Sequence, residues 1–317
     1  MTVNVTKPAL NIREKLAELD KPSGIAGEAM LRADSVQEQR NLIGAGRKNL
    51  IINGGFDVWQ RGTSLSPNLG YSADRWKQND VDSPITQNIP TLSVKETGRM
   101  LIKSVGTNTG RIMRAQGVEL KQSDIGKTMT FSFKISKAAA AVFGSSAYIQ
   151  LGIKADSMVI RDGTKTTITT VSEVSTSSSA PTSLSISFVV PTFTNYLGVG
   201  FVIDLLTNTQ ATTELFRVQD IQLELGSVAT DFEHRSYGEE LALCQRYFFA
   251  SENQFQYVAD EGGVKHYNFP SEMRSAPTVT MSSAPSGMTI NRTRKHFATF
   301  NGATVNGDVT FTADAEL

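Results

Sequence analysis

Strict alternation between apolar and polar residues in two short runs constrains the fold of this chain more than any other feature. Thr130–Ile135 reads Thr-Phe-Ser-Phe-Lys-Ile, and Ser183–Phe188 reads Ser-Leu-Ser-Ile-Ser-Phe. A period of two gives a strand one apolar face and one polar face. Such a strand has to bury its apolar face against another layer.

Further short strand-like runs follow one another from Asn49 to Glu224, separated by turn signals rather than by long helices. They are Thr91–Lys95, Met100–Val105, Arg111–Ala115, Thr128–Ser136, Ala147–Ile153, Thr166–Val171, Ser183–Val190, Leu197–Leu205 and Leu215–Leu225. This spacing predicts a mainly β fold, built as an antiparallel sandwich or barrel.

The segment Asn49–Lys77 contains both tryptophans of the chain, Trp59 and Trp76. Its apolar start and later alternation predict an opening strand, and Leu215–Leu225 predicts the closing strand beside it. The tryptophans are either core residues or platforms on which a sugar ring stacks, and their place near strand starts favours the core.

The ends of the chain differ from this middle part. Residues 1–48 carry two capping boxes and few apolar residues, which predicts short helices in an arm that orders against a partner or stays flexible. A third capping box, Ser236–Glu239, predicts a linking helix within 236–249. We therefore predict an arm (1–48), a sandwich (49–235), this linking helix and a small C-terminal β domain (250–317).

Composition excludes several classes of function. The 317 residues carry 31 basic and 31 acidic side chains, so no global field recruits nucleic acid or an anionic membrane. No run of 18 apolar residues is present, which predicts a soluble product without membrane insertion. The single cysteine, Cys244, excludes an internal disulfide and is expected in the core.

The sequence contains no motif for catalysis. Its three histidines are far apart, and it has neither a nucleophile elbow nor a phosphate-binding glycine-rich loop. We predict that the protein is not an enzyme. A glycoside hydrolase needs only two carboxylates across a groove, at no fixed spacing in sequence, so a depolymerase stays open as an alternative.

Several segments resemble proteins of tailed bacteriophages. Asn49–Phe56 with Tyr71–Trp76, and Asp220–Tyr247 with its Phe-Glu-His-Arg and Gly-Glu-Glu-Leu motifs, resemble the two ends of a region found in tail-fibre and other virion proteins. The N-terminal arm and the terminal Ala313–Leu317 are similar to the corresponding parts of those proteins. The resemblance implies a virion structural protein that is made in the host cytoplasm, is anchored to the tail or capsid by residues 1–48, and forms a homotrimer.

The opening Asn53–Asp57 and the closing Val218–Ile221 are also similar to the two ends of jelly-roll carbohydrate-binding modules. In that family, acidic residues at these ends help to hold a structural calcium ion. The resemblance implies that Asp57 and Asp220 are its ligands here, although Gln219 stands where an aspartate is common. Without a metal, Asp57 caps a turn and Asp220 is a solvated strand residue.

Adhesion to host-surface glycans is the function that these resemblances favour. Side chains in distal loops of a rigid β scaffold often provide recognition. The candidates are Tyr257, His266, Tyr267, Arg292, Arg294 and Asn301. The basic run Asn291–His296 either grips an anionic polysaccharide or is a solvated turn. A purely structural fibre, decoration or adaptor protein without a receptor is the main alternative.

Overall fold

The computed structural model describes residues 48–65, 70–78, 81–82, 91–104, 110–137, 148–160, 170–171, 180–204, 214–251, 255–257, 264–302 and 306–317. The chain divides into two compact units, Met1–Lys48 and Asn49–Leu317. The helices predicted in the arm lie outside the described residues. The other predicted boundaries, at 235 and 249, fall within the second unit.

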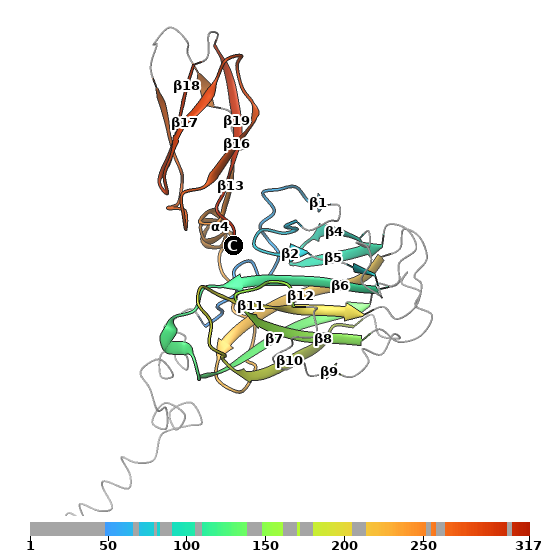
Figure 1. Ribbon diagram of the computed structural model, residues 1–317. Coiled ribbons are helices and arrows are strands. Elements are labelled where there is room, and N and C mark those ends of the chain that lie inside the picture. The colour runs from blue at the N-terminus through green and yellow to red at the C-terminus, as the bar shows by residue number, and fades with distance from the viewer. Residues whose placement is uncertain are drawn as a thin grey trace, which may run out of the picture. The chain divides into compact units, whose positions relative to one another are not determined.

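Two antiparallel sheets form the sandwich, as the alternation predicted (Figure 1). The first sheet has the order β1 (Ser64–Leu65), β4 (Thr91–Glu96), β5 (Arg99–Ser104), β12 (Glu214–Leu225), β7 (Thr128–Lys137) and β10 (Thr182–Val189). The second has the order β2 (Lys77–Gln78), β6 (Gly110–Val118), β11 (Leu197–Asp204), β8 (Tyr148–Ala155) and β9 (Thr170–Val171), and β3 (Val81–Asp82) also pairs with β6. A 3-10 turn, η1 (Gln122–Asp124), precedes β7.

The apolar faces of the alternating strands meet in one core. Phe131 and Phe133 of β7 are buried, and the ring of Phe133 lies 5.1 Å from that of Phe201 on the opposite sheet. The serines of β10 alternate with Leu184 and Phe188, which are buried. The period-two pattern therefore determined which face of each strand is inside.

The opening segment is not a strand, which corrects the prediction for Leu50–Gln60. The prediction that this segment lies beside the closing strand is confirmed, because the Leu50 amide donates to the Leu223 carbonyl at 2.8 Å. Asn53 and Phe56 have φ of 59° and 58°, a left-handed conformation that breaks an extended strand. The segment forms irregular turns in which Trp59 and Trp76 are buried, as expected of core residues.

Gly54 is needed for the approach of this segment to β12. A Cβ atom there would lie 2.1 Å from the carbonyl oxygen of Ile221, whose amide in turn donates to the Gly54 carbonyl at 3.0 Å. Only glycine permits so close a contact between two backbones.

The predicted linking helix is α4 (Tyr237–Gln245), and its capping box is formed by Ser236 and Glu239. Cys244 is buried on its inner face, as predicted. Burial raises the pKa of the Cys244 thiol well above its ordinary value, so the thiol stays protonated and unreactive.

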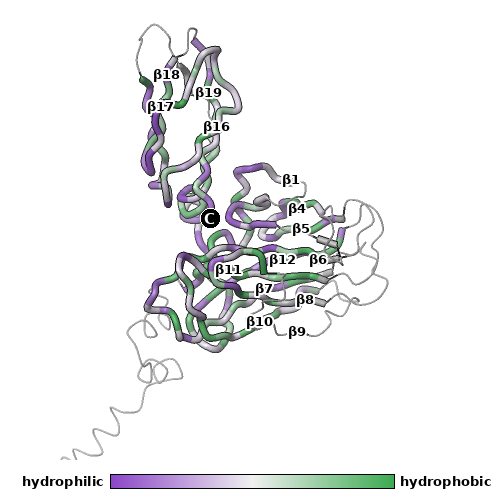
Figure 2. The backbone as a smooth tube through the Cα atoms, viewed as in Figure 1, coloured by the Kyte–Doolittle hydropathy of each residue, from purple (hydrophilic) through white to green (hydrophobic). Residues whose placement is uncertain are grey.

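The last part of the chain forms two smaller sheets around a second core. One contains β13 (Phe248–Ala250), β14 (Phe255–Tyr257), β16 (Thr278–Ser283) and β19 (Gly307–Asp314), and the other has the order β15 (Lys265–Asn268), β18 (Phe297–Asn301) and β17 (Thr289–Thr293). Phe249, Phe300 and Phe311 are central to this core. Hydrophilic and hydrophobic residues both occur along these strands (Figure 2).

Candidate functional site

Three of the six predicted glycan-contact residues lie on the outer face of the sheet β15-β18-β17. His266 and Arg292 both pair with Thr299, so their exposed side chains project to the same face. Asn301 lies on the same face, where its Oδ1 accepts from the hydroxyl of Thr289 at 2.8 Å. We refer to this surface as the outer basic face.

The other three predicted residues lie elsewhere. Arg294 is exposed in the turn after β17, where its amide donates to the Phe297 carbonyl at 2.8 Å. Tyr267 projects to the opposite face of its sheet, and its ring lies 5.0 Å from that of Phe311. Tyr257 belongs to β14, and its side chain lies outside the described part of the structure.

Tyr267 lines a pocket that sequence analysis missed. This α4 pocket, of about 190 Å³, lies between the linking helix and the second core. Its lining residues are Gln60, Tyr237, Leu241, Gln245, Phe249, Ala250 and Tyr267. Tyr237 is 58% exposed, which is high for so large an apolar ring. Tyr237 directly follows the N-cap residue Ser236. The capping box was the one sequence signal that placed this ring at the start of a helix.

The amide of Gln60 is held in place at the α4 pocket by the main chain. Its Nε2 donates to the Phe248 carbonyl at 2.8 Å, and its Oε1 accepts from the Ala250 amide at 3.5 Å. Gln60 and Gln245 are amides, and the other lining residues are aromatic or aliphatic. The α4 pocket therefore combines three aromatic rings with two amides and, among the described residues, has no charged side chain in its lining.

A second hollow, of about 210 Å³, lies on the outer face of the first sheet of the sandwich. Its lining residues include Ser132, Ser183, Ser185 and Phe232. Lys134 and Asp220 also line it and form an ion pair with an N–O distance of 2.7 Å. We call it the sheet groove.

The two residues implied in calcium binding differ in their surroundings. Asp220 forms an ion pair within the protein, and Asp57 is exposed. Asp220 has φ 56° at a bulge in β12, and its carboxylate pairs with Lys134. Asp57 is exposed, and its carbonyl accepts from Lys95 Nζ at 2.7 Å. Within the described ranges no group of three or more His, Cys, Asp and Glu side chains is placed to hold a metal ion. Calcium at these two residues stays a prediction.

A buried ionic cluster, the C-terminal clamp, ties the end of the chain to the sandwich. It consists of Arg61, Asp74, Arg75, Tyr247 and Glu316. Arg75 is fully buried, forms an ion pair with Glu316, and its guanidinium carbon lies 3.4 Å from the centroid of the Tyr247 ring. Arg61 bridges Asp74 at 3.0 Å and Glu316 at 3.3 Å.

Electrostatics in the C-terminal clamp shift the pKa values of its groups. Burial raises the pKa of Asp74 to about 6, with a contribution from Glu316 and against the opposing effect of Arg61. Burial lowers the pKa of Arg75, but the negative charge of Glu316, together with Tyr247, Tyr71 and Cys244, outweighs it and leaves that pKa above its ordinary value. A carboxyl with a raised pKa can mark a catalytic acid. Asp74 instead accepts hydrogen bonds from the Gln60 amide and Arg61 and lines neither hollow, which indicates a structural role.

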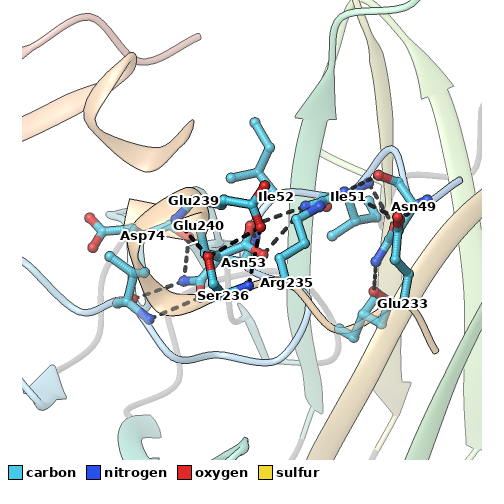
Figure 3. Close-up of polar contacts among 12 residues, drawn as sticks. Asn49, Ile51, Ile52, Asn53, Asp74, Glu233, Arg235, Ser236, Glu239 and Glu240 are labelled. Carbon is cyan, nitrogen blue, oxygen red and sulfur yellow. Dashed lines mark hydrogen bonds and ion pairs between the residues drawn. The ribbon is translucent and has the colours of Figure 1, made fainter. Parts of the chain in front are cut away.

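Three motif residues between Phe232 and Tyr247, namely Glu233, Arg235 and Glu240, form a second cluster with Asn49, Ile51 and Asn53 of the opening segment (Figure 3). We call this cluster the opening latch. Arg235 donates to the carbonyl of Ile51 at 2.9 Å and to that of Asn49. These residues hold the start of the sandwich, and none of them lines either hollow. Phe232, which precedes Glu233 in the sequence, does line the sheet groove.

No family model and no curated protein matches this chain. Solved structures that are similar to part of it include a CBM4 carbohydrate-binding module, with 17% identity and a TM-score of 0.37, over 55% of this chain and 98% of that one. The Stig cyclase Fisc from Fischerella sp. TAU has 10% identity and a TM-score of 0.35, over 57% and 98%. The module TmCBM61, solved with beta-1,4-galactotriose, has 11% identity and a TM-score of 0.31, over 56% and 99%. At such TM-scores neither a ligand nor an activity transfers to this chain.

Among the described helices, none has the length and apolar character required to cross a membrane.

Proposed function

We propose that this chain is a virion structural protein of a tailed bacteriophage that adheres to host-surface glycans through the α4 pocket. The lining of that pocket is the observation that carries the glycan-binding part, and the virion part rests on the resemblance of the sequence motifs. Aromatic rings stack on the C–H faces of sugar rings, and fixed amides exchange hydrogen bonds with sugar hydroxyls. Tyr237, Tyr267 and Phe249 supply the rings, and Gln60 and Gln245 supply the amides.

The pocket favours a neutral sugar. Its described lining residues carry no formal charge, so a sialic acid or uronic acid would lose hydration of its carboxylate there without gaining a cationic partner among them. A neutral hexose buries its apolar face on the rings and keeps its hydroxyls paired with the amides and with water.

A glycan array with the full-length protein tests this proposal, followed by titration of the sugars that bind. We expect Tyr237→Ala to weaken binding roughly 5- to 30-fold, since loss of one stacked ring costs on the order of 1–2 kcal/mol. Tyr237→Phe is the matched control, because it keeps the ring and removes only the hydroxyl. Unchanged binding by a Tyr237→Ala, Tyr267→Ala double variant would contradict the proposal.

The outer basic face extends the proposal to anionic glycans. His266 and Arg292 are exposed side by side across Thr299, and Arg294 follows in the next turn. Guanidinium groups bind sulfate, phosphate and carboxylate by paired hydrogen bonds. If this face binds, Arg292→Ala with Arg294→Ala abolishes the anionic signals on the array and leaves the neutral ones intact.

Residues 1–48 serve as the anchor to the tail or capsid in this proposal, and the assembled protein is a homotrimer. Three weak sites on one particle raise avidity by effective concentration. Analytical ultracentrifugation of the intact chain, and of a chain lacking residues 1–48, tests the oligomeric state and the contribution of the arm. The first should sediment as a trimer.

A purely structural virion component is the second candidate, and the opening latch favours it. The phage-like motif residues Glu233, Arg235 and Glu240 form internal contacts rather than a binding surface. If this role is the whole function, particles that carry the Tyr237→Ala, Tyr267→Ala variant adsorb to host cells as well as the parent. A depolymerase would instead release reducing ends from host polysaccharide.

A further inference from the structure

The sheet groove lies over rows of side chains that cross neighbouring strands of the first sheet. Residues that pair directly between β7 and β10 project to the same side of the sheet. On the outer side they form three rows, Ser187–Thr130, Ser185–Ser132 and Ser183–Lys134. The second and third rows line the groove, and the first row lies next to it.

The segment that follows β12 satisfies the hydroxyls of the first row. The Thr130 hydroxyl donates to the Gly226 carbonyl and the Ser187 hydroxyl to the Ser227 carbonyl, each at 2.8 Å. In the part of the chain that the structure describes, the hydroxyls of the three groove serines have no hydrogen-bond partner in the protein. One face of one sheet therefore carries hydroxyls bonded to the chain beside hydroxyls that are left for another molecule.

A bulge in β12 brings Asp220 to the groove. The register of β12 against β7 shifts between Gln219 and Gln222, and Asp220 has φ 56°. Bulges re-aim side chains, and a left-handed residue other than glycine costs free energy. The Asp220 carboxylate meets Lys134 at 2.7 Å, but their side chains remain 17% and 44% exposed. The second carboxylate oxygen and two ammonium protons can therefore bond to a ligand.

Residues 229–232 supply the rest of the polar and aromatic lining. The ring of Phe232 is half-buried, and it lies edge-on to the ring of His234 with 4.9 Å between the centroids. Asp231 also lines the groove. The described lining thus contains two carboxylates, one ammonium group, several hydroxyls and one aromatic ring.

This lining suits a small neutral ring that carries many hydroxyl groups. The two carboxylates oppose an anion, and Lys134 opposes a cation. The hydroxyls of a sugar both donate and accept, so they can replace the waters that a polar hollow of about 210 Å³ holds. The ring of Phe232 offers a surface for the C–H groups of the same sugar.

We propose that the sheet groove is a second saccharide-binding site, which takes one neutral sugar ring through Asp220, Lys134 and the groove serines. It shares no lining residue with the α4 pocket. The two sites also differ in chemistry, because the α4 pocket offers three aromatic rings and the sheet groove offers mainly hydrogen bonds. Binding in the groove does not require that the α4 pocket binds a sugar.

A chemical-shift titration of the isotope-labelled, full-length protein with D-glucose, D-galactose and D-mannose tests this. At millimolar concentrations, at least one hexose should shift the backbone amide signals of Ser183 and Gln222 until they saturate. D-Glucuronate should not, because carboxylates line the groove. Ser132→Ala with Ser185→Ala should weaken hexose binding at least fivefold, since two hydrogen bonds are lost.

Two further variants separate binding from folding. Ser187→Ala is the matched control, because this serine lies on the same face but its hydroxyl is bonded to the Ser227 carbonyl, so binding should not change. Asp220→Asn keeps the size of the side chain and tolerates positive φ. It should weaken hexose binding and allow D-glucuronate to shift the groove signals, because Lys134 then pairs with the sugar carboxylate. A purely structural ion pair would not produce this change of selectivity.

Hexose shifts confined to the α4 pocket would overturn this proposal and leave the α4 site intact. Shifts confined to the sheet groove would support it and contradict binding at α4. The absence of groove shifts with all three hexoses would overturn it, and so would equal weakening by Ser187→Ala and by the Ser132→Ala, Ser185→Ala variant.

Discussion

The opening latch and the C-terminal clamp hold the two ends of the described unit by different means. In the latch, a residue close in sequence to α4 binds the main chain of the opening segment, so the side chains of Asn49 and Ile51 are not needed for that contact. In the clamp, the contacts join side chains, Arg61 and Arg75 with Glu316, that are far apart in the chain.

This difference determines what each cluster demands of the sequence. Main-chain contacts require a particular backbone conformation, which Gly54 and the left-handed Asn53 provide. Side-chain contacts require particular charges, and burying them requires that every charge have a partner. The clamp should therefore be the more sensitive to substitution of one charged side chain and to pH, and the latch to changes in the backbone.

Removal of Arg75 should have the largest effect. Arg75→Ala leaves Glu316 with the more distant Arg61 as its cationic partner and opens a space beside Tyr247. We expect a loss of about 3–5 kcal/mol in the free energy of unfolding, measured by denaturant titration. Arg99→Ala is the control, since that arginine pairs with Glu96 at the surface and should cost less than about 1 kcal/mol. Equal losses would show that the clamp contributes no more than a surface ion pair.

Lowering the pH should strengthen the clamp at Asp74. The folded-state pKa of about 6 lies above the value of 3.8 in an unfolded chain, so the folded state binds a proton more tightly. The stabilisation from this proton is complete below about pH 4 and is lost as the pH rises through 6. This difference between the folded and unfolded pKa values corresponds to about 3 kcal/mol in the free energy of unfolding.

The free energy of unfolding of the parent protein and of Asp74→Asn, measured from pH 4 to pH 8, tests this. The parent should lose stability relative to the variant as the pH rises, because the asparagine does not ionise. A constant difference between the two proteins would contradict the raised pKa.

Substitution of Asn53 should break the backbone of the latch. Its Oδ1 accepts from the Val58 amide at 3.0 Å, and its Nδ2 donates to the carbonyls of Val58 and Asp74. We expect Asn53→Ala to cost about 2 kcal/mol, since buried main-chain groups lose partners and alanine is disfavoured at positive φ. Asn53→Gly also lacks the amide but adopts positive φ readily, so a smaller loss there than in Asn53→Ala would separate the two causes.

Loss of the helix cap should have the smallest effect. Ser236 Oγ accepts from the Glu239 amide at 3.4 Å, and Glu239 reaches back to the Ser236 amide at 3.3 Å. Ser236→Ala should cost about 1 kcal/mol in the free energy of unfolding. Ser236→Thr should cost less because it retains the hydroxyl. A loss as large as that of Asn53→Ala would mean that the cap also positions Arg235.

Local pattern predicted the parts of the fold that depend on local chemistry. The alternating strands, the helix after the capping box at Ser236, and the buried Trp59, Trp76 and Cys244 all follow from period, capping and hydrophobicity. The predicted opening strand was wrong because left-handed residues at Asn53 and Phe56 carry no unambiguous signal in a single sequence. Strands of two residues, such as β1 and β2, are too short to show a period.

The candidate site was predictable only in part, for a physical reason. Periodicity and the order of strands determine which residues of one sheet share a face. For this reason His266 and Arg292, both predicted from the sequence, lie on one face on either side of Thr299. The α4 pocket joins Gln60, a helix and Tyr267, and the two clusters join charges from opposite ends of the unit. Sequence by itself determined the elements and their buried faces. The packing of these elements against one another decided which aromatic rings, amides and charges are in contact. Each such contact joins residues that are far apart along the chain, so no local pattern predicts it.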